Sequence, residues 1–162
     1  MNYRRLIVIL AILVAAVAVM IFSFSTESRE ESSKTSDQVV EWLLQRFYPG
    51  YNELRNKQKR ILRHQYQEPV RKAAHGLEFM LLGTFLFLFL HGIELRRSGL
   101  WAWVGGTLYA ATDELHQTLV SGRGGMVTDV CIDSGGVLAG IFLGLALLAL
   151  FHRIFGRKPR KT

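Results

Sequence analysis

Four long apolar runs constrain this chain more than any other feature of its sequence. Residues 6–24 contain 19 positions without a charge, which lets a helix cross about 30 Å of hydrocarbon. Three further runs follow at residues 73–92, 100–119 and 130–151, and each has its few polar side chains near one end. A soluble helical bundle could contain such segments, but a chain of 162 residues cannot readily bury all four. The sequence therefore predicts an all-α protein, a four-helix transmembrane bundle.

The first apolar run has a second interpretation as a secretory signal peptide, because Arg4 and Arg5 give it a basic start. It is long for a signal peptide, however, and its end lacks a small-x-small cleavage motif. We therefore expect an uncleaved membrane anchor at residues 6–24, preceded by a short N-terminus of residues 1–5.

Basic residues beside the apolar runs predict the orientation of the bundle. In a four-span arrangement the basic N-terminus, Arg96, Arg97 and the basic tail of residues 152–162 all fall on one side of the membrane. The positive-inside rule makes that side cytoplasmic, so both termini are expected there. The net charge of +7 follows from this placement and does not indicate nucleic-acid binding.

Two segments are expected on the extracytoplasmic side, a long loop of residues 25–72 and a short turn of residues 120–129. Residues 26–36 are rich in serine and charge, and this composition predicts a flexible linker. Ser36 or Asp37 can then cap a helix with one apolar face. The long loop is thus expected to become helical only after the linker.

The second half of the long loop is basic. Residues 51–68 carry apolar side chains at helical spacing and predict a helix. This helix either lies on the outer membrane surface against anionic lipid or is solvated on all sides. Pro69 is expected among the first residues of the next helix, where proline is tolerated. Arg71 and Lys72 lie on the outer side against the positive-inside trend.

Polar residues in the last three apolar runs are all predicted near the outer side of the membrane. Six of these residues lie within the runs, and Asp129 lies just before the fourth run. The full set is His75, Glu78, Asp113, Glu114, Gln117, Asp129 and Asp133. Charged groups at membrane depth are costly and normally face partners or a water-filled cavity. Asp113 and Gln117 are four residues apart and share a helix face, as do Asp129 and Asp133. We expect three helices to present these groups to one cavity, although the groups could instead pair and lock the bundle.

The residue types in this cluster allow several kinds of chemistry. The candidate catalytic groups, suited to general acid–base steps, are Glu114, Asp113, Asp129, Asp133 and His75. The candidate substrate-binding residues are Arg71, Lys72, Glu78, Gln117 and Arg123. The basic residues of the cluster could hold a phosphate headgroup. The carboxylates could also hold a divalent cation, because oxygen ligands suit magnesium or calcium.

Two remaining features concern architecture. Gly136, Gly140 and Gly144 form two overlapping GxxxG steps, which predict a close helix-packing face. Cys131 is the only cysteine, which excludes an intramolecular disulfide and a multi-thiolate metal site. We expect it to be a buried helix residue.

The order and spacing of the polar residues resemble the pattern of VanZ-like membrane proteins. The matching pieces, within residues 22–144, are Arg71-Lys72-x-x-His75-x-x-Glu78, Asp113-Glu114-x-x-Gln117, and Gly122-Arg123 followed by Asp129-x-x-x-Asp133-x-x-Gly136. Gly76 stands where an aromatic residue is usual, and Phe79 where tyrosine is common. The resemblance implies a small bacterial multi-pass membrane protein, in a family named for a member associated with low-level teicoplanin resistance. It implies no settled reaction.

Three functions compete for such a protein. The first is an envelope enzyme acting on a lipid or lipid-linked cell-wall intermediate. The second is a non-catalytic protein that binds lipid or antibiotic at the outer surface. The third, a small transporter or proton-coupled device, is disfavoured because a relay needs ionisable groups through the membrane midplane. The expected partner is therefore a membrane lipid or a lipid-linked envelope precursor.

Overall fold

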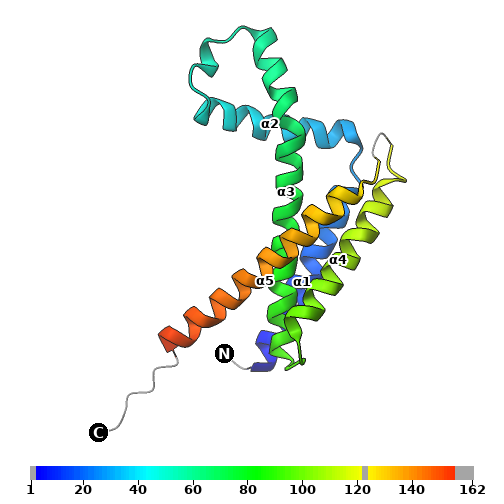
Figure 1. The fold of residues 1–162 in the computed structure, drawn as a ribbon, viewed down its shortest axis with the longest axis vertical. Coiled ribbons are helices and arrows are strands. Elements are labelled where there is room, and N and C mark those ends of the chain that lie inside the picture. The colour runs from blue at the N-terminus through cyan, green and yellow to red at the C-terminus, as the bar shows by residue number, and fades with distance from the viewer. Residues whose placement is uncertain (1–2, 122–123, 156–162) are drawn as a thin grey trace.

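The computed structural model describes residues 3–121 and 124–155, and this part of the chain is all-α (Figure 1). It contains five α-helices, one short 3-10 helix and no strand. The elements are α1 (Tyr3–Ser25), α2 (Arg29–Phe47), η1 (Tyr51–Glu53), α3 (Asn56–Gly92), α4 (Ser98–Gln117) and α5 (Val127–Phe155). The predicted all-α class is confirmed. Arg123 and nearly all basic residues of the predicted tail lie outside the described residues.

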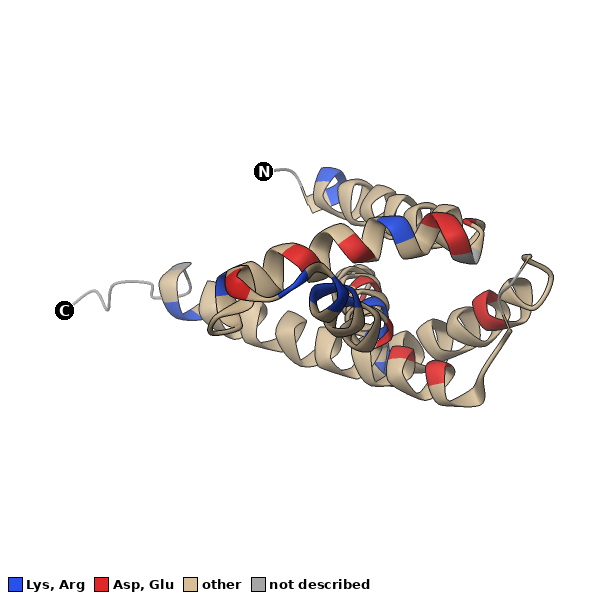
Figure 2. Ribbon diagram, turned by 90° about the horizontal axis from the view of Figure 1, so that it is seen from above, with Lys and Arg blue, Asp and Glu red and all other residues tan. Residues whose placement is uncertain are grey.

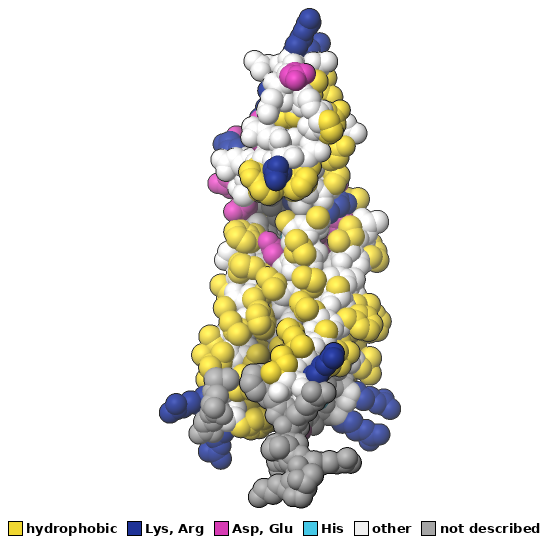
Figure 3. Space-filling model, turned by 90° about the vertical axis from the view of Figure 1, so that its left-hand side faces the viewer, with side chains coloured by type: hydrophobic (Ala, Val, Ile, Leu, Met, Phe, Trp, Pro, Cys, Tyr) yellow, Lys and Arg dark blue, Asp and Glu magenta, His cyan; other side chains and the backbone are white. Residues whose placement is uncertain are grey.

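Three of the described helices, α1, α3 and α5, are long and apolar enough to cross a membrane. They include the predicted spans at residues 6–24, 73–92 and 130–151. The predicted span at residues 100–119 corresponds to α4, which has 20 residues but is less apolar because its last turns are polar. Hydrophobic side chains cover the lower two thirds of the face in Figure 3. Cys131, predicted to be buried, is exposed on α5, because a spanning helix turns much of its surface to lipid.

Close helix contacts at glycine hold α3 and α5 together, and these two helices share the largest interface of the bundle. A Cβ atom built at Gly136 would collide with the carbonyl oxygen of Gly76, and one at Gly140 with that of Met80. A Cβ at Gly144 would meet the ring of Phe87 at 2.6 Å. The predicted glycine packing face is therefore confirmed, with α3 as its partner. Small residues allow the backbones to approach this closely.

Different helix ends and connections lie at the two ends of the bundle. The start of α1, the connection between α3 and α4, and the end of α5 lie together at the lower end in Figure 1. The start of α2, the end of α4 and the start of α5 lie at the opposite end. Beyond that end, α2, η1 and the first turns of α3 form an arm that projects from the bundle.

The flexible linker predicted at residues 26–36 is wrong for most of its length, because α2 already begins at Arg29. Ser28 caps the helix, and its hydroxyl accepts the backbone N–H of Glu31 while the Glu31 carboxylate accepts that of Ser28. This reciprocal pair is a capping box. The Ser28 hydrogen bonds lower the pKa of Glu31. The cap predicted at Ser36 or Asp37 is therefore incorrect, since both residues lie inside α2.

The separate helix predicted at residues 51–68 is also wrong, because α3 runs without a break from Asn56 to Gly92. Pro69 lies within it and not near its start. A proline inside a helix removes one backbone hydrogen bond. Here Leu62 before the proline and Val70 after it both pack against the buried cluster of Val40, Leu44 and Tyr51. Contact with this cluster on both sides of Pro69 keeps α3 continuous.

Partly buried hydrogen bonds around the Glu41 carboxylate hold the elements of the arm together. The Tyr51 hydroxyl donates to the Glu41 carboxylate at 2.8 Å, and Arg63 of α3 binds the same carboxylate at 2.8 Å. Burial together with the hydrogen bond to Glu41 raises the pKa of Tyr51 to about 12. Burial alone would raise the pKa of Glu41, but the donors around it lower it. The arm is thus a packed unit with charges matched inside it.

Candidate functional site

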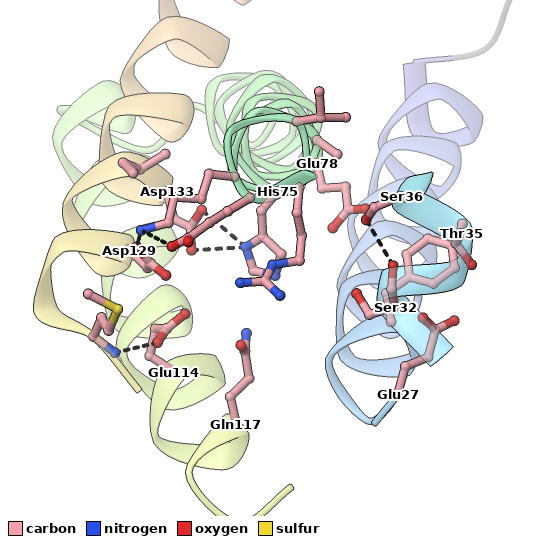
Figure 4. A pocket seen from close by; sticks show the side chains of 18 of the residues that line it. Glu27, Ser32, Thr35, Ser36, His75, Glu78, Glu114, Gln117, Asp129 and Asp133 are labelled. Carbon is pink, nitrogen blue, oxygen red and sulfur yellow. Dashed lines mark hydrogen bonds and ion pairs between the residues drawn. The ribbon is translucent and has the colours of Figure 1, made fainter. Parts of the chain in front are cut away.

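A cavity of about 210 Å³ lies at the arm end of the bundle, where α1, α2 and α3 meet α4 and α5 (Figure 4). Its polar lining residues are Glu27, Ser32, Thr35, Ser36, Glu68, Arg71, Lys72, His75, Glu78, Glu114, Gln117, Asp129 and Asp133. Figure 2, seen from above, shows that the acidic positions of α4 and α5 lie where the ends of these helices meet. The cavity is therefore a polar site at one end of an otherwise apolar bundle.

Most of the residues predicted for the site come together here. Eight of the ten candidates line the cavity: Arg71, Lys72, His75, Glu78, Glu114, Gln117, Asp129 and Asp133. Asp113 is buried just behind the cavity wall, in contact with residues that line it. Arg123 falls outside the described residues. The predicted convergence of three helices is present, and the chemical role of each residue stays a prediction.

His75 of α3 joins carboxylates from two other helices. Its Nδ1 atom lies 3.0 Å and 3.1 Å from the two carboxylate oxygens of Asp133, which is 1% exposed. Its Nε2 atom lies 3.6 Å from a carboxylate oxygen of Asp113, which is 3% exposed. A carboxylate bound to one ring nitrogen sets the orientation and tautomer of an imidazole. Asp133 therefore orients His75 and leaves Nε2 as its second functional atom.

Asp113 is held by two further donors. The Ser25 hydroxyl at the end of α1 donates to Asp113 at 2.8 Å, and the Gln117 amide donates to the same oxygen at 2.9 Å. Ser25 is fully buried, so α1 is tied to α4 by a polar contact inside the bundle. Polar side chains between helices in lipid stabilise their packing by about 0.6 kcal/mol on average. Asp113 thus connects the cavity to α1.

Lys72 is committed to neighbouring acids. Its ammonium donates to Asp129 of α5 at 2.6 Å and lies 3.5 Å from Glu68, one helical turn earlier. This pairing neutralises the charge of Lys72 at the cavity end of the bundle. It also means that Lys72 could bind a phosphate only in competition with Asp129.

Glu114 links the end of α4 to the start of α5. Its carboxylate accepts the backbone N–H of Met126 at 2.9 Å, and the residue is 6% exposed. The Glu114 carbonyl lies so close to Gly125 that a Cβ there would be 2.7 Å away. Glu114 therefore has a structural role in this turn, besides lining the cavity.

Three titratable side chains at the site keep a buried atom without a hydrogen-bond partner among the described residues. These atoms are His75 Nε2, Glu78 Oε2 and Asp113 Oδ1. Buried polar atoms are nearly always hydrogen-bonded, so each exception calls for a functional or structural explanation. His75 and Glu78 line the cavity. Of the two atoms, His75 Nε2 lies 3.6 Å from Asp113, and both keep hydrogen-bonding capacity that no described residue uses.

Several lining residues come from the segment that was predicted to be a linker. Glu27, Ser32, Thr35 and Ser36 form one wall of the cavity, and Figure 4 shows them facing the residues of α3 and α5. The sequence did contain a signal for this wall, because Ser28-x-x-Glu31 has the spacing of a capping box. With the helix started at Ser28, the spacing of the wall residues would have placed them on one face.

No group of three or more His, Cys, Asp or Glu side chains is arranged to hold a metal ion within residues 3–121 and 124–155. The divalent cation considered from the sequence thus has no ligand set in this part of the chain. It stays a prediction.

The fold and the cavity define a class of protein, a small all-α membrane protein with a polar site at one end of an apolar bundle. A family model described as VanZ/LLP1 matches residues 8–151. The chain belongs to the VanZ/LLP1 family, as the residue pattern indicated. No curated protein and no solved structure matches it.

Proposed function

We propose that this chain is a four-span integral membrane protein that binds the headgroup of a membrane lipid or lipid-linked cell-envelope intermediate and acts on it at the outer surface. The observation that supports this proposal is the cavity in which two ionisable side chains, His75 and Glu78, keep a buried atom without a hydrogen-bond partner among the described residues. The cavity lies at the end of membrane-length helices, where a lipid headgroup would be found.

The topology rests on α4 as the fourth span, with both termini in the cytoplasm. Arg5 lies in the first turn of α1, Arg97 between α3 and α4, and Arg153 in the last turn of α5. These segments are at the lower end of the bundle in Figure 1, and Figure 3 shows basic side chains around that end. The positive-inside rule places this end in the cytoplasm. α4 packs against both α3 and α5, which fits a helix at the same membrane depth.

Cysteine labelling tests this topology in a Cys131→Ser background. A cysteine at Lys34, an exposed residue of α2, should react with an impermeant maleimide in intact cells. A cysteine at Arg97, exposed between α3 and α4, should react only after the cells are opened. The reverse pattern would rule out the proposed orientation.

The chemistry proposed for the site is general acid–base catalysis by His75. Asp133 orients the imidazole through Nδ1, and Nε2 is left to take or give a proton on a bound headgroup. Arg71 lines the same cavity and makes no ion pair among the described residues, unlike Lys72. Its planar guanidinium could bind a phosphate with two parallel hydrogen bonds.

A second candidate function is non-catalytic binding of a lipid or an antibiotic at the outer surface. One observation favours it. Lys72 is already paired with Asp129, and Glu114 with the Met126 amide, so part of the polar network locks the bundle. In this version the cavity holds a headgroup without changing it. Both versions include a link to glycopeptide resistance, which the family name suggests.

The experiment uses the full chain, purified in detergent with lipids retained, and native mass spectrometry to identify them. If His75 is needed to bind the lipid, a His75→Gln variant should lose most of the retained lipid. If His75 is needed only for the reaction, the variant should retain the lipid without changing its chemical structure. A Glu53→Gln variant is the control, because it removes an exposed carboxylate of η1, which does not line the cavity.

Incubation of that lipid with fresh protein separates the two versions. A product that forms with wild type and not with His75→Gln supports the enzyme. Retention by wild type that is lost in His75→Gln, without product in either, supports the binding protein. Equal retention and no product in wild type and His75→Gln would refute both versions. Teicoplanin susceptibility of cells that express each variant then tests the link to resistance.

A further inference from the structure

The face of α2 that lines the cavity continues beyond the cavity as an exposed apolar surface. Ser32, Ser36 and Val39 line the cavity and lie one helical turn apart. The residues that follow at the same spacing are Trp42, Leu43, Arg46 and Phe47. We call Val39, Trp42, Leu43, Arg46 and Phe47 the Trp42 face.

The Trp42 face leaves large apolar side chains uncovered. Val39 is 45% exposed, Trp42 60% and Phe47 70%. The rings of Trp42 and Phe47 contact each other edge to face, with centroids 6.3 Å apart. A contiguous exposed apolar patch on a folded protein marks an interaction surface, with a protein or with a membrane.

The opposite side of α2 is polar and pairs within itself. Lys34 lies 3.3 Å from Glu30, and the Gln45 amide donates to Glu41 at 2.9 Å. Glu30, Lys34 and Glu41 lie about half a helical turn from the centre of the Trp42 face, and Gln45 lies at the boundary, three residues after Trp42. A third side of the helix carries Val40 and Leu44, which are buried against α3. Each side of α2 therefore has a different environment. The Trp42 face is its exposed apolar side, and Leu43 and Phe47 at the edge of this face also line a hollow with Tyr66 and Val70 of α3.

The position of α2 gives this face a direction. In Figure 1, α2 crosses α3 at a steep angle, just beyond the end of the apolar bundle. The cavity lies between α2 and the bundle, so the residues of α2 that line it point toward the bundle. The Trp42 face is on the same side of α2 as the residues that line the cavity. Where α2 extends past the edge of the bundle, this side faces the membrane in the proposed topology.

We infer that α2 lies on the outer leaflet of the membrane with its Trp42 face in the headgroup region. This inference rests on the proposed four-span topology, which puts the arm outside. A tryptophan, a phenylalanine and a snorkelling arginine on one face, opposite a polar face, are the side chains that an interfacial helix uses. At the same end of the bundle, Phe22 and Phe24 of α1 are also 48% and 46% exposed.

This placement has a consequence for the cavity. Val39 belongs both to the cavity wall and to the Trp42 face. A helix that rests on the leaflet through this face puts the cavity at the depth of the lipid headgroups. A headgroup can then enter from the side, with its acyl chains still in the membrane.

The test measures the depth of labels on the two sides of α2. Single cysteines replace Trp42 or Phe47 on the Trp42 face, and Glu30 or Lys34 on the polar side as matched controls, all in a Cys131→Ser background. Each carries a nitroxide, and the full chain is placed in vesicles of phosphatidylethanolamine and phosphatidylglycerol. Collision with oxygen, which is soluble in lipid, is compared with collision with a nickel chelate, which is soluble in water.

The ratio of oxygen to nickel accessibility should be severalfold higher at positions 42 and 47 than at positions 30 and 34. Equal, water-like ratios at all four positions would overturn the inference. Protection of positions 42 and 47 from both reagents would also overturn it, because a protein would then cover the face.

If these variants fail to fold, a second measurement uses Trp42 itself, in a chain with Trp101→Phe and Trp103→Phe. Brominated lipid should quench its fluorescence, and no quenching would refute membrane contact. Neither measurement needs a ligand in the cavity. A failure here can therefore be told apart from a failure of the lipid-binding experiment on His75→Gln.

Discussion

Two neighbouring glycines of α5 allow the contact between α3 and α5 to be tested with an internal control. A Cβ atom at Gly136 would collide with the carbonyl oxygen of Gly76, whereas a Cβ at Gly135 meets nothing within 4 Å. Both glycines lie inside the same helix, so alanine should give both the same gain in helix propensity, about 1 kcal/mol. Any difference between Gly136→Ala and Gly135→Ala then reports the packing against α3.

The magnitude follows from the atoms involved. The neighbours of Gly136 are backbone atoms of α3, which cannot turn aside as a flexible side chain would. Overpacking of this kind typically costs about 1–3 kcal/mol. We therefore expect Gly135→Ala to be neutral or slightly stabilising. Gly136→Ala should be less stable than Gly135→Ala by about 1–3 kcal/mol.

The same substitution should also disturb the cavity, because Gly76 follows His75 and Gly136 lies three residues after Asp133. Moving the helices apart at this level lengthens the 3.0 Å contact between His75 and Asp133. Reversible unfolding in mixed micelles, followed by circular dichroism, measures the stability of both variants. A Gly136→Ala protein as stable as Gly135→Ala would refute the reasoning about close packing.

Three other predictions concern single contacts. Replacing Asp133 by alanine leaves a buried ring nitrogen of His75 unpaired and should lower the free energy of unfolding by about 1–3 kcal/mol, measured in the same micelles. Burial and the hydrogen bond to Glu41 favour the neutral form of Tyr51, so they stabilise the folded arm fully below pH 10.0, the ordinary tyrosine pKa. This stabilisation should be lost as the pH rises toward the folded-state pKa of about 12. Hydrogen exchange of α2 should show that loss in wild type and not in Tyr51→Phe. Arg123→Lys keeps the charge but loses the planar fork, so it should fold normally and lose lipid binding; normal binding would make Arg123 a structural residue.

The apolar parts of the fold were predictable because their signal is strong and local. Three predicted spans are present as helices of sufficient length and apolarity, and the glycine spacing on α5 correctly indicated a packing face. The polar residues of the site were also found, since charges inside apolar runs are rare and their helix positions imply a shared side. His75 and Asp133 lie 58 residues apart and are in contact.

The arm was predicted less well, because there the local signals disagree with the packing. A serine-rich, charged composition favours a linker, yet Ser28 and Glu31 form a capping box that starts α2 early. The linker was predicted from the average composition of the segment, whereas the start of the helix depends on only two side chains, Ser28 and Glu31. The cavity wall that α2 supplies was missed for this reason.

At Pro69, too, the local sequence signal disagrees with the packing. Proline inside a helix costs about 3 kcal/mol, so sequence reasoning places a helix boundary near it. In α3 the helix continues, because Leu62 and Val70 on the two sides of the proline pack against the same apolar cluster, formed by Val40 and Leu44 of α2 and Tyr51 of η1. Breaking α3 at Pro69 would separate these contacts and would turn Val40 and Leu44 to water. The continuity of α3 therefore depends on α2, and it is this long helix that carries α2 across the end of the bundle, where it forms a wall of the cavity.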